Sequence, residues 1–124
     1  MGRKILLVED YEDTRLFMKF LLESYGYEVT EAVDGLEAIE SFKHHFPDLI
    51  LMDIAMPVMD GLTATKAIRQ FKHGAVIPII AVTAHGKQFY EKAIEAGCNQ
   101  LISKPIDFDS LEPVLNQYLG HQSV

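Results

Sequence analysis

Residues 49–61 read LILMDIAMPVMDG, and this stretch decides the fold. An unbroken apolar run ends at one carboxylate, Asp53, and the pattern then breaks at Pro57 and Gly61. A continuous run of Leu, Ile and Met is typical of a strand buried on both faces, as in a parallel sheet covered by helices. Ligands of open α/β sheets bind beyond the carboxyl ends of the strands, so Asp53 is a candidate reactive group. On this stretch alone, a role in capping the following turn explains Asp53 equally well.

The bulk properties of the chain limit its class. At 124 residues it can bury its own core, and we expect a single domain over residues 1–124. The net charge is −7 without a basic stripe, so direct binding to nucleic acid is not expected. The single cysteine, Cys98, reads as a small core residue, and with no leader pattern this indicates a cytoplasmic protein. No apolar run approaches the roughly 20 residues of a membrane helix. We therefore expect a monomer whose partners are proteins, with no membrane contact.

Strand-like runs alternate with segments of helical spacing along the whole chain. The predicted strands cover residues 5–8, 27–31, 49–53, 79–82 and 101–103. Apolar residues recur at helical spacing around 16–21, 36–46, 62–71, 89–94 and 108–119, the last helix with Asp107 as its N-cap. This alternation predicts an α/β fold: a flavodoxin-like, doubly wound, five-stranded parallel sheet in the order 2-1-3-4-5, with five helices.

Polar residues gather where the predicted strands end. They are Glu9 and Asp10 after the first strand, Asp53 at the end of the third, Thr83 after the fourth and Lys104 after the fifth. Taken singly, a threonine in a strand and a solvated lysine are ordinary. In the predicted order the first and third strands are neighbours, and all of these ends lie at one edge of the sheet. Their shared location favours a functional site.

Three carboxylates in one pocket need compensation. At about 5 Å and an effective dielectric near 20, each pair repels by about 3 kcal/mol, so the group must hold a proton or bind a cation. A cation is the simpler solution, and an all-oxygen site suits Mg²⁺ better than Zn²⁺, which prefers His and Cys. A carboxylate beside such a metal can attack a phosphoryl group, with Lys104 neutralising its oxygens and Thr83 donating a hydrogen bond.

Four motifs carry a resemblance to a known family. They are LLVED at 6–10, LMDIAMPVMDG at 51–61, IIAVTA at 79–84 and SKP at 103–105. In this order and spacing the chain resembles a response-regulator receiver domain of two-component signalling, of the chemotaxis-regulator-like single-domain kind. The resemblance implies that Asp53 is the phosphoacceptor and that Mg²⁺ is held by Glu9, Asp10, Asp53 and the backbone carbonyl of Ala55. It also implies that Thr83 and Lys104 bind phosphoryl oxygens, and that the Lys104–Pro105 peptide is cis.

The resemblance also implies the partners. The phosphoryl donor is expected to be a sensor histidine kinase or a histidine phosphotransfer protein, docked on the first helix at Tyr11, Thr14, Arg15 and Met18, although Met18 suits the core equally well. Output is expected by contact with a downstream protein, through the face around the fourth and fifth helices, or by phosphorelay. Such a domain catalyses only its own phosphorylation and dephosphorylation, so we do not expect a conventional enzyme.

Three positions depart from the family pattern. Leu101 stands three residues before the lysine, where many receivers carry an aromatic switch residue. Ala55 lies two residues beyond Asp53 and cannot orient water. His85 lies two residues beyond Thr83 and is interpreted as a solvent-facing residue at a helix start, with phosphoryl contact as the alternative; the other histidines, His44, His45, His73 and His121, are expected at the surface.

Other functions remain open on the residues alone. One is a small Mg²⁺-dependent phosphatase with an aspartyl-phosphate intermediate, disfavoured because Ile54 and Ala55 supply no general acid after Asp53. A flavin-binding domain is disfavoured because no phosphate-binding loop follows the first strand. A receiver-like scaffold that is never phosphorylated is disfavoured by the intact polar set.

Overall fold

The computed structural model describes residues 2–56 and 59–120, so Pro57 and His121 lie outside the described residues. Within these ranges the chain alternates strands and helices from end to end. The elements are β1 (Lys4–Val8), α1 (Glu12–Ser24), β2 (Glu28–Ala32), α2 (Gly35–His45), β3 (Leu49–Asp53), α3 (Gly61–Arg69), the short 3₁₀ turn η1 (Lys72–Gly74), β4 (Ile79–Thr83), α4 (Gly86–Ala96), β5 (Gln100–Ser103) and α5 (Phe108–Leu119). Each predicted strand and helix is present, with bounds shifted by a few residues.

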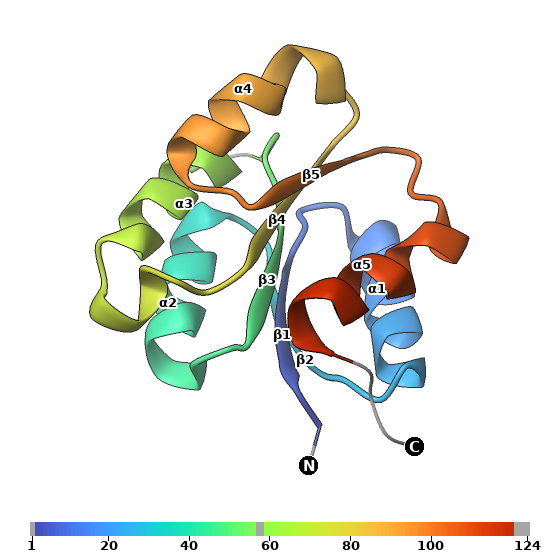
Figure 1. Ribbon diagram of the computed structural model, residues 1–124. Coiled ribbons are helices and arrows are strands. Elements are labelled where there is room, and N and C mark those ends of the chain that lie inside the picture. The colour runs from blue at the N-terminus through green and yellow to red at the C-terminus, as the bar shows by residue number, and fades with distance from the viewer. Residues whose placement is uncertain (1, 57–58, 121–124) are drawn as a thin grey trace.

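The strands form one parallel sheet in the order β2-β1-β3-β4-β5, which confirms the flavodoxin-like topology. Figure 1 shows α1 and α5 on one face of this sheet and α2, α3 and α4 on the other. Every residue of β3 and β4 is buried, as their unbroken apolar sequences predict. Because all strands are parallel, their carboxyl ends lie along the same edge of the sheet.

Polar caps and a glycine set the helix ends. The side chains of Asp34, Asp60 and Asp107 accept hydrogen bonds from backbone N–H groups in the first turns of α2, α3 and α5. Asp107 is therefore the N-cap that the sequence predicts. Gly97 ends α4 with a φ of 113°, a left-handed conformation that favours glycine. The three aspartate caps fix where loops at the carboxyl edge of the sheet end, and Gly97 turns the chain into β5 at the opposite edge.

Helix α1 has a different buried face from the one the sequence pattern indicates. Phe17 and Phe20, which have helical spacing, are 50% and 71% exposed, and Leu16 is 49% exposed. Met18 and Leu22 instead face the sheet and belong to the core cluster of that layer. Met18 is thus a core residue that also lines a pocket beside α1, so both interpretations of it hold. Several large apolar side chains of α1 face outward.

Gly61, the first residue of α3, lies directly against the end of β3. Its N–H donates to the Ile54 carbonyl over 3.2 Å. A Cβ atom at this position would collide with the Asp53 carbonyl oxygen and lie 2.7 Å from Ile54 Cα. Both neighbours are backbone, so neither can rotate away. The absence of a side chain at Gly61 therefore lets α3 begin beside the Asp53 peptide.

We expect Gly61→Ala to lower the free energy of unfolding by about 1–3 kcal/mol, because overpacking against backbone must displace either β3 or α3. Chemical denaturation measures the change. Thr63→Ala is the matched control, since Thr63 is exposed on the same helix and its side chain leaves this contact untouched. Equal stability of Gly61→Ala and wild type would show that α3 shifts without cost.

Candidate functional site

The sequence-predicted residues meet at the carboxyl edge of the sheet. Glu9 follows β1, and Asp53 ends β3, the neighbour of β1. Thr83 ends β4, and its carbonyl accepts a hydrogen bond from the Lys104 N–H over 2.8 Å. Glu9, Asp53 and Thr83 are each at most 4% exposed. The strand order thus brings residues far apart in sequence into one buried polar site.

The three carboxylates form a compact cluster. One oxygen each from Glu9, Asp10 and Asp53 lies within 4.8 Å of the others. Glu9 and Asp53 are buried, whereas Asp10 is exposed. Lys104 compensates part of this charge, because its Nζ lies 2.9 Å from Glu9 Oε1 and 3.3 Å from Asp53 Oδ2. A lysine ammonium thus bridges the two buried acids.

Burial and charge together shift the pKa values at this site. Burial and the neighbouring Glu9 raise the pKa of Asp53 to about 6, against the opposing effects of the Ala55 N–H and Lys104. Burial also acts to raise the pKa of Glu9, but hydrogen bonds from the Tyr11 N–H and Lys104 outweigh it and lower that pKa. The pKa of Lys104 is raised, since its two acidic partners outweigh the cost of burying its charge. At neutral pH the site therefore carries an ammonium between acids that are mostly ionised.

Backbone groups orient the two polar side chains at the ends of β3 and β4. The Ala55 N–H donates to Asp53 Oδ1 over 3.1 Å. The His85 N–H donates to Thr83 Oγ1 over 3.2 Å. Because Thr83 Oγ1 accepts this bond, its own proton remains available to donate elsewhere. The two oxygens of Asp53 are distinguished, since Oδ1 receives the backbone N–H and Oδ2 faces Lys104.

The donor set at this cluster fits a hard divalent cation. Its three clustered ligand atoms are all carboxylate oxygens, and two of the acids are buried where an uncompensated charge is costly. The exposed side of the cluster, at Asp10, leaves room for the waters that Mg²⁺ retains. Oxygen-only coordination of this kind favours Mg²⁺ over Zn²⁺.

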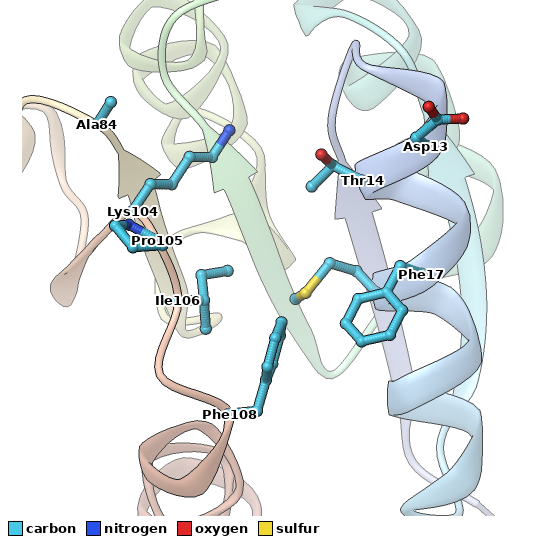
Figure 2. Close-up of a pocket in the computed structure, with 9 residues that line it drawn as sticks. Asp13, Thr14, Phe17, Ala84, Lys104, Pro105, Ile106 and Phe108 are labelled. Carbon is cyan, nitrogen blue, oxygen red and sulfur yellow. The ribbon is translucent and has the colours of Figure 1, made fainter.

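An apolar groove adjoins the cluster. It encloses about 610 Å³ and runs between α1 and the segment from β5 to α5. Figure 2 shows Lys104 and Thr14 on opposite walls near one end, and Phe17 and Phe108 nearer the other. The rings of Phe17 and Phe108 meet edge to face with centroids 5.1 Å apart. The sequence pattern did not reveal this groove, because the helical spacing of Phe17 marks an apolar stripe without showing whether that stripe is covered.

The structure shows the burial of the remaining residues that the sequence singled out. His85 is exposed at the start of α4, as expected, and Cys98 is buried in the core. Leu101 is partly buried and packs against the core cluster on the side of α4. The Lys104–Pro105 peptide is cis, as the resemblance implied. His44, His45 and His73 are exposed.

Arg15 is not a freely exposed docking residue. Its guanidinium donates to Glu31 Oε1 over 3.1 Å and to the Glu9 carbonyl over 3.2 Å. The Arg15 side chain is 15% exposed. The expectation that Arg15 forms the edge of a docking surface therefore changes, because its charged end is turned toward the acidic loop and β2.

We expect Asp53→Asn to stabilise the metal-free protein at pH 8 by about 1–3 kcal/mol. The pKa of Asp53 is raised from 3.8 to about 6 in the folded state, so ionisation of this group costs stability above that pH. The advantage of the variant should shrink as the pH falls from 6 to about 3, below the ordinary pKa of 3.8, where Asp53 is mostly protonated in both states. Denaturation in EDTA across this range measures it. Greater stability of the wild type at pH 8 would contradict the repulsive environment.

Comparisons with known proteins identify the family. The family description "Response regulator receiver domain" matches residues 5–116. The polar-differentiation response regulator DivK of Brucella ovis is 39% identical over 121 residues, covering 97% of this chain and 98% of that protein. The DivK protein of Brucella anthropi is also 39% identical, with the same coverage.

Solved structures agree with this match. The receiver domain of sensor histidine kinase PA1611 from Pseudomonas aeruginosa PAO1, with a magnesium ion coordinated in its active-site cleft, superposes with a TM-score of 0.91 at 39% identity. That match covers 97% of this chain and 99% of the other. Chemotaxis protein CheY4 of Vibrio cholerae gives a TM-score of 0.90 at 29% identity. That match covers 96% of this chain and 100% of the CheY4 chain. The fold, the acidic cluster and these matches together establish that the chain belongs to the response regulator receiver domain family of two-component signalling.

Proposed function

We propose that this receiver accepts a phosphoryl group on Asp53 from a phosphohistidine and signals through the resulting change in protein contacts. The observation that carries the proposal is the setting of Asp53. Its buried carboxylate shares a 4.8 Å cluster with Glu9 and Asp10, and its Oδ2 lies 3.3 Å from Lys104. A structural role alone does not account for so much uncompensated negative charge beside a bridging lysine.

The proposed transfer assigns a role to each polar group. An Asp53 carboxylate oxygen attacks phosphorus, the bond from phosphorus to the donor imidazole nitrogen breaks, and an aspartyl phosphate forms. The Ala55 N–H holds Oδ1. Lys104 stays close to the developing negative charge, and the Thr83 hydroxyl proton is available to a phosphoryl oxygen. Donors and a cation held at such a site stabilise the charge that develops during the transfer.

Glu9, Asp10, Asp53 and the backbone carbonyl of Ala55 would hold Mg²⁺ in this proposal. When bound, the ion supplies positive charge that screens the phosphoryl oxygens from the carboxylates. Lys104 Nζ pairs with Glu9 Oε1 at 2.9 Å and so offsets part of the carboxylate charge that would hold the ion. The donor chemistry of the cluster supports this assignment.

The phosphohistidine donor, a sensor histidine kinase or a histidine phosphotransfer protein, is proposed to dock over the apolar groove. The groove reaches Lys104, so a partner seated there lies beside Asp53. Phe17 and Phe20 on α1 provide exposed apolar surface next to it.

We propose that the chain works as one receiver unit, as a monomer in the cytoplasm, and acts on no other substrate. Among the described residues, no helix has the length and hydropathy needed to cross a bilayer.

Output is proposed to use the face around α4, β5 and α5, by contact with a downstream protein or by onward phosphorelay. Leu101 on β5 is partly buried beside α4, and a Cβ at Gly86 would lie 3.1 Å from its Cδ2. An aliphatic side chain so closely packed offers no aromatic ring to rotate. Phosphorylation therefore shifts this face only as far as new contacts at Thr83 and Lys104 favour one arrangement over another.

Incubation of the wild type with acetyl phosphate and Mg²⁺ should add the mass of one phosphoryl group, and Asp53→Asn should not acquire it. Lys104→Ala should slow the reaction by about 100-fold, because a preorganised cation is lost from the charge that develops on phosphorus. Intact mass spectrometry over time measures both. Lys66→Ala is the matched control, since Lys66 is exposed on α3 away from the cluster.

An equal adduct on Asp53→Asn, or no adduct on the wild type, would overturn the assignment of the phosphoacceptor. Steady turnover of a generic phosphate ester would instead support the phosphatase alternative. A folded wild type that takes up no phosphoryl group would favour the scaffold alternative, a receiver-like protein that is never phosphorylated.

Phe17→Ser should slow phosphoryl transfer from a phosphohistidine donor by about 10-fold, as expected for the loss of one apolar anchor, while leaving the reaction with acetyl phosphate unchanged. The two reactions should respond differently because Phe17 lines the groove where the donor protein is proposed to dock but is not one of the clustered carboxylates. Transfer from a phosphorylated histidine phosphotransfer protein is followed by radiolabel. Val76→Ser is the control, since Val76 is 84% exposed before the start of β4, at the opposite end of the sheet. Equal transfer rates for Phe17→Ser and wild type would remove the groove from donor docking.

A further inference from the structure

Arg15 connects the acidic loop to the edge of the sheet. It lies in the second turn of α1, and its guanidinium reaches both Glu31 on β2 and the Glu9 carbonyl, at 3.1 Å and 3.2 Å. Its side chain is 15% exposed, which is low for an arginine on a surface helix. The sequence pattern assigned Arg15 to a docking edge and gave it no internal partner.

The carbonyl that Arg15 contacts belongs to the peptide joining Glu9 to Asp10. Because a peptide group is planar, holding this oxygen fixes the orientation of the whole link between the two acids. The other side of Glu9 is also held, since its N–H donates to the Ala32 carbonyl over 3.0 Å. Glu9 is thus bonded to β2 on one side and to Arg15 on the other.

The charge of Arg15 argues against a purely electrostatic purpose. A cation bonded to the acidic loop repels Mg²⁺, so its charge alone would weaken metal binding. Glu31 offsets this charge through the 3.1 Å ion pair, which leaves the guanidinium fork to act as a geometric brace. Lys19 also forms an ion pair with Glu31, at 3.9 Å, and a second one with Glu23, at 3.8 Å. Among the described residues, Lys19 has no hydrogen bond to Glu9.

We propose that Arg15 is a positioning residue that, braced by Glu31, orients the Glu9–Asp10 peptide so that both acids present their oxygens to a divalent cation. This inference rests on the proposed role of the acidic cluster and deepens it. The brace acts through the backbone and does not touch the ion or the phosphoryl group. Loss of the brace releases a peptide rotation, and the two acids then lose their fixed relation to Asp53.

The sign of the change in Mg²⁺ affinity tests the proposal. Arg15→Gln should raise the Mg²⁺ dissociation constant about 10-fold, the lower end of the range for groups that orient metal ligands. If Arg15 acted only as a nearby charge, the same change would tighten binding. Lys19→Gln is the matched control, because it removes one cation from the same helix and from Glu31 but leaves the Glu9 carbonyl bonded. It should leave affinity unchanged or slightly tighter.

Isothermal titration with Mg²⁺ alone measures the affinity, and thermal unfolding in EDTA checks the fold of each variant. A merely structural role would lower the melting temperature without changing the affinity of the folded protein. Arg15→Lys is the second variant and keeps the charge, but one ammonium cannot reproduce the fork, so its affinity should also fall. Unchanged or tighter binding by Arg15→Gln, or full recovery by Arg15→Lys, would overturn the proposal. A wild type that binds no Mg²⁺ would instead refute the metal site itself.

Discussion

The structure depends on the cost of holding three carboxylates within 4.8 Å of one another at the end of a buried sheet. Ionised acids in this setting repel, and burial deprives two of them of water. The bridging ammonium of Lys104 meets part of the cost, and the raised pKa of Asp53 shows that part remains. Stability is thus given up locally to hold charge at the edge where we propose that a cation and a phosphoryl group bind. The remaining sheet, with β3 and β4 wholly buried, supplies the rigidity that keeps the acids together.

The sequence was sufficient for the fold and for the residues at the strand ends. Continuous apolar runs, and alternation in the second strand, identified the strands. The parallel order then required Glu9, Asp53, Thr83 and Lys104 to share one edge. The sequence was not sufficient to predict which face of α1 packs against the sheet. Phe17 and Phe20 have helical spacing, yet Met18 and Leu22 face the sheet, because periodicity finds an apolar stripe without saying what lies opposite it. An unusually wide apolar stripe was the available signal for an outward-facing surface.

The partners of Arg15 and Lys104 were also beyond the sequence. Arg15 pairs with Glu31, sixteen residues away, and Lys104 pairs with Glu9 across 95 positions. The first pairing depends on the β1–β2 register and the tilt of α1, and the second on where the chain leaves β5. No local pattern encodes either. The charges could be located in sequence, but their neutralisation could be assigned only from the folded geometry.

Lys104 belongs to two environments, since it lines the apolar groove and also bonds to the buried acids. A partner that fills the groove therefore changes the surroundings of the same ammonium group that neutralises Asp53. Occupancy of the groove and the charge carried at Asp53 become linked equilibria, and each must alter the free energy of the other by the same amount. Through this one side chain, a protein bound in the groove changes the free energy of ionising Asp53 without any movement of a helix.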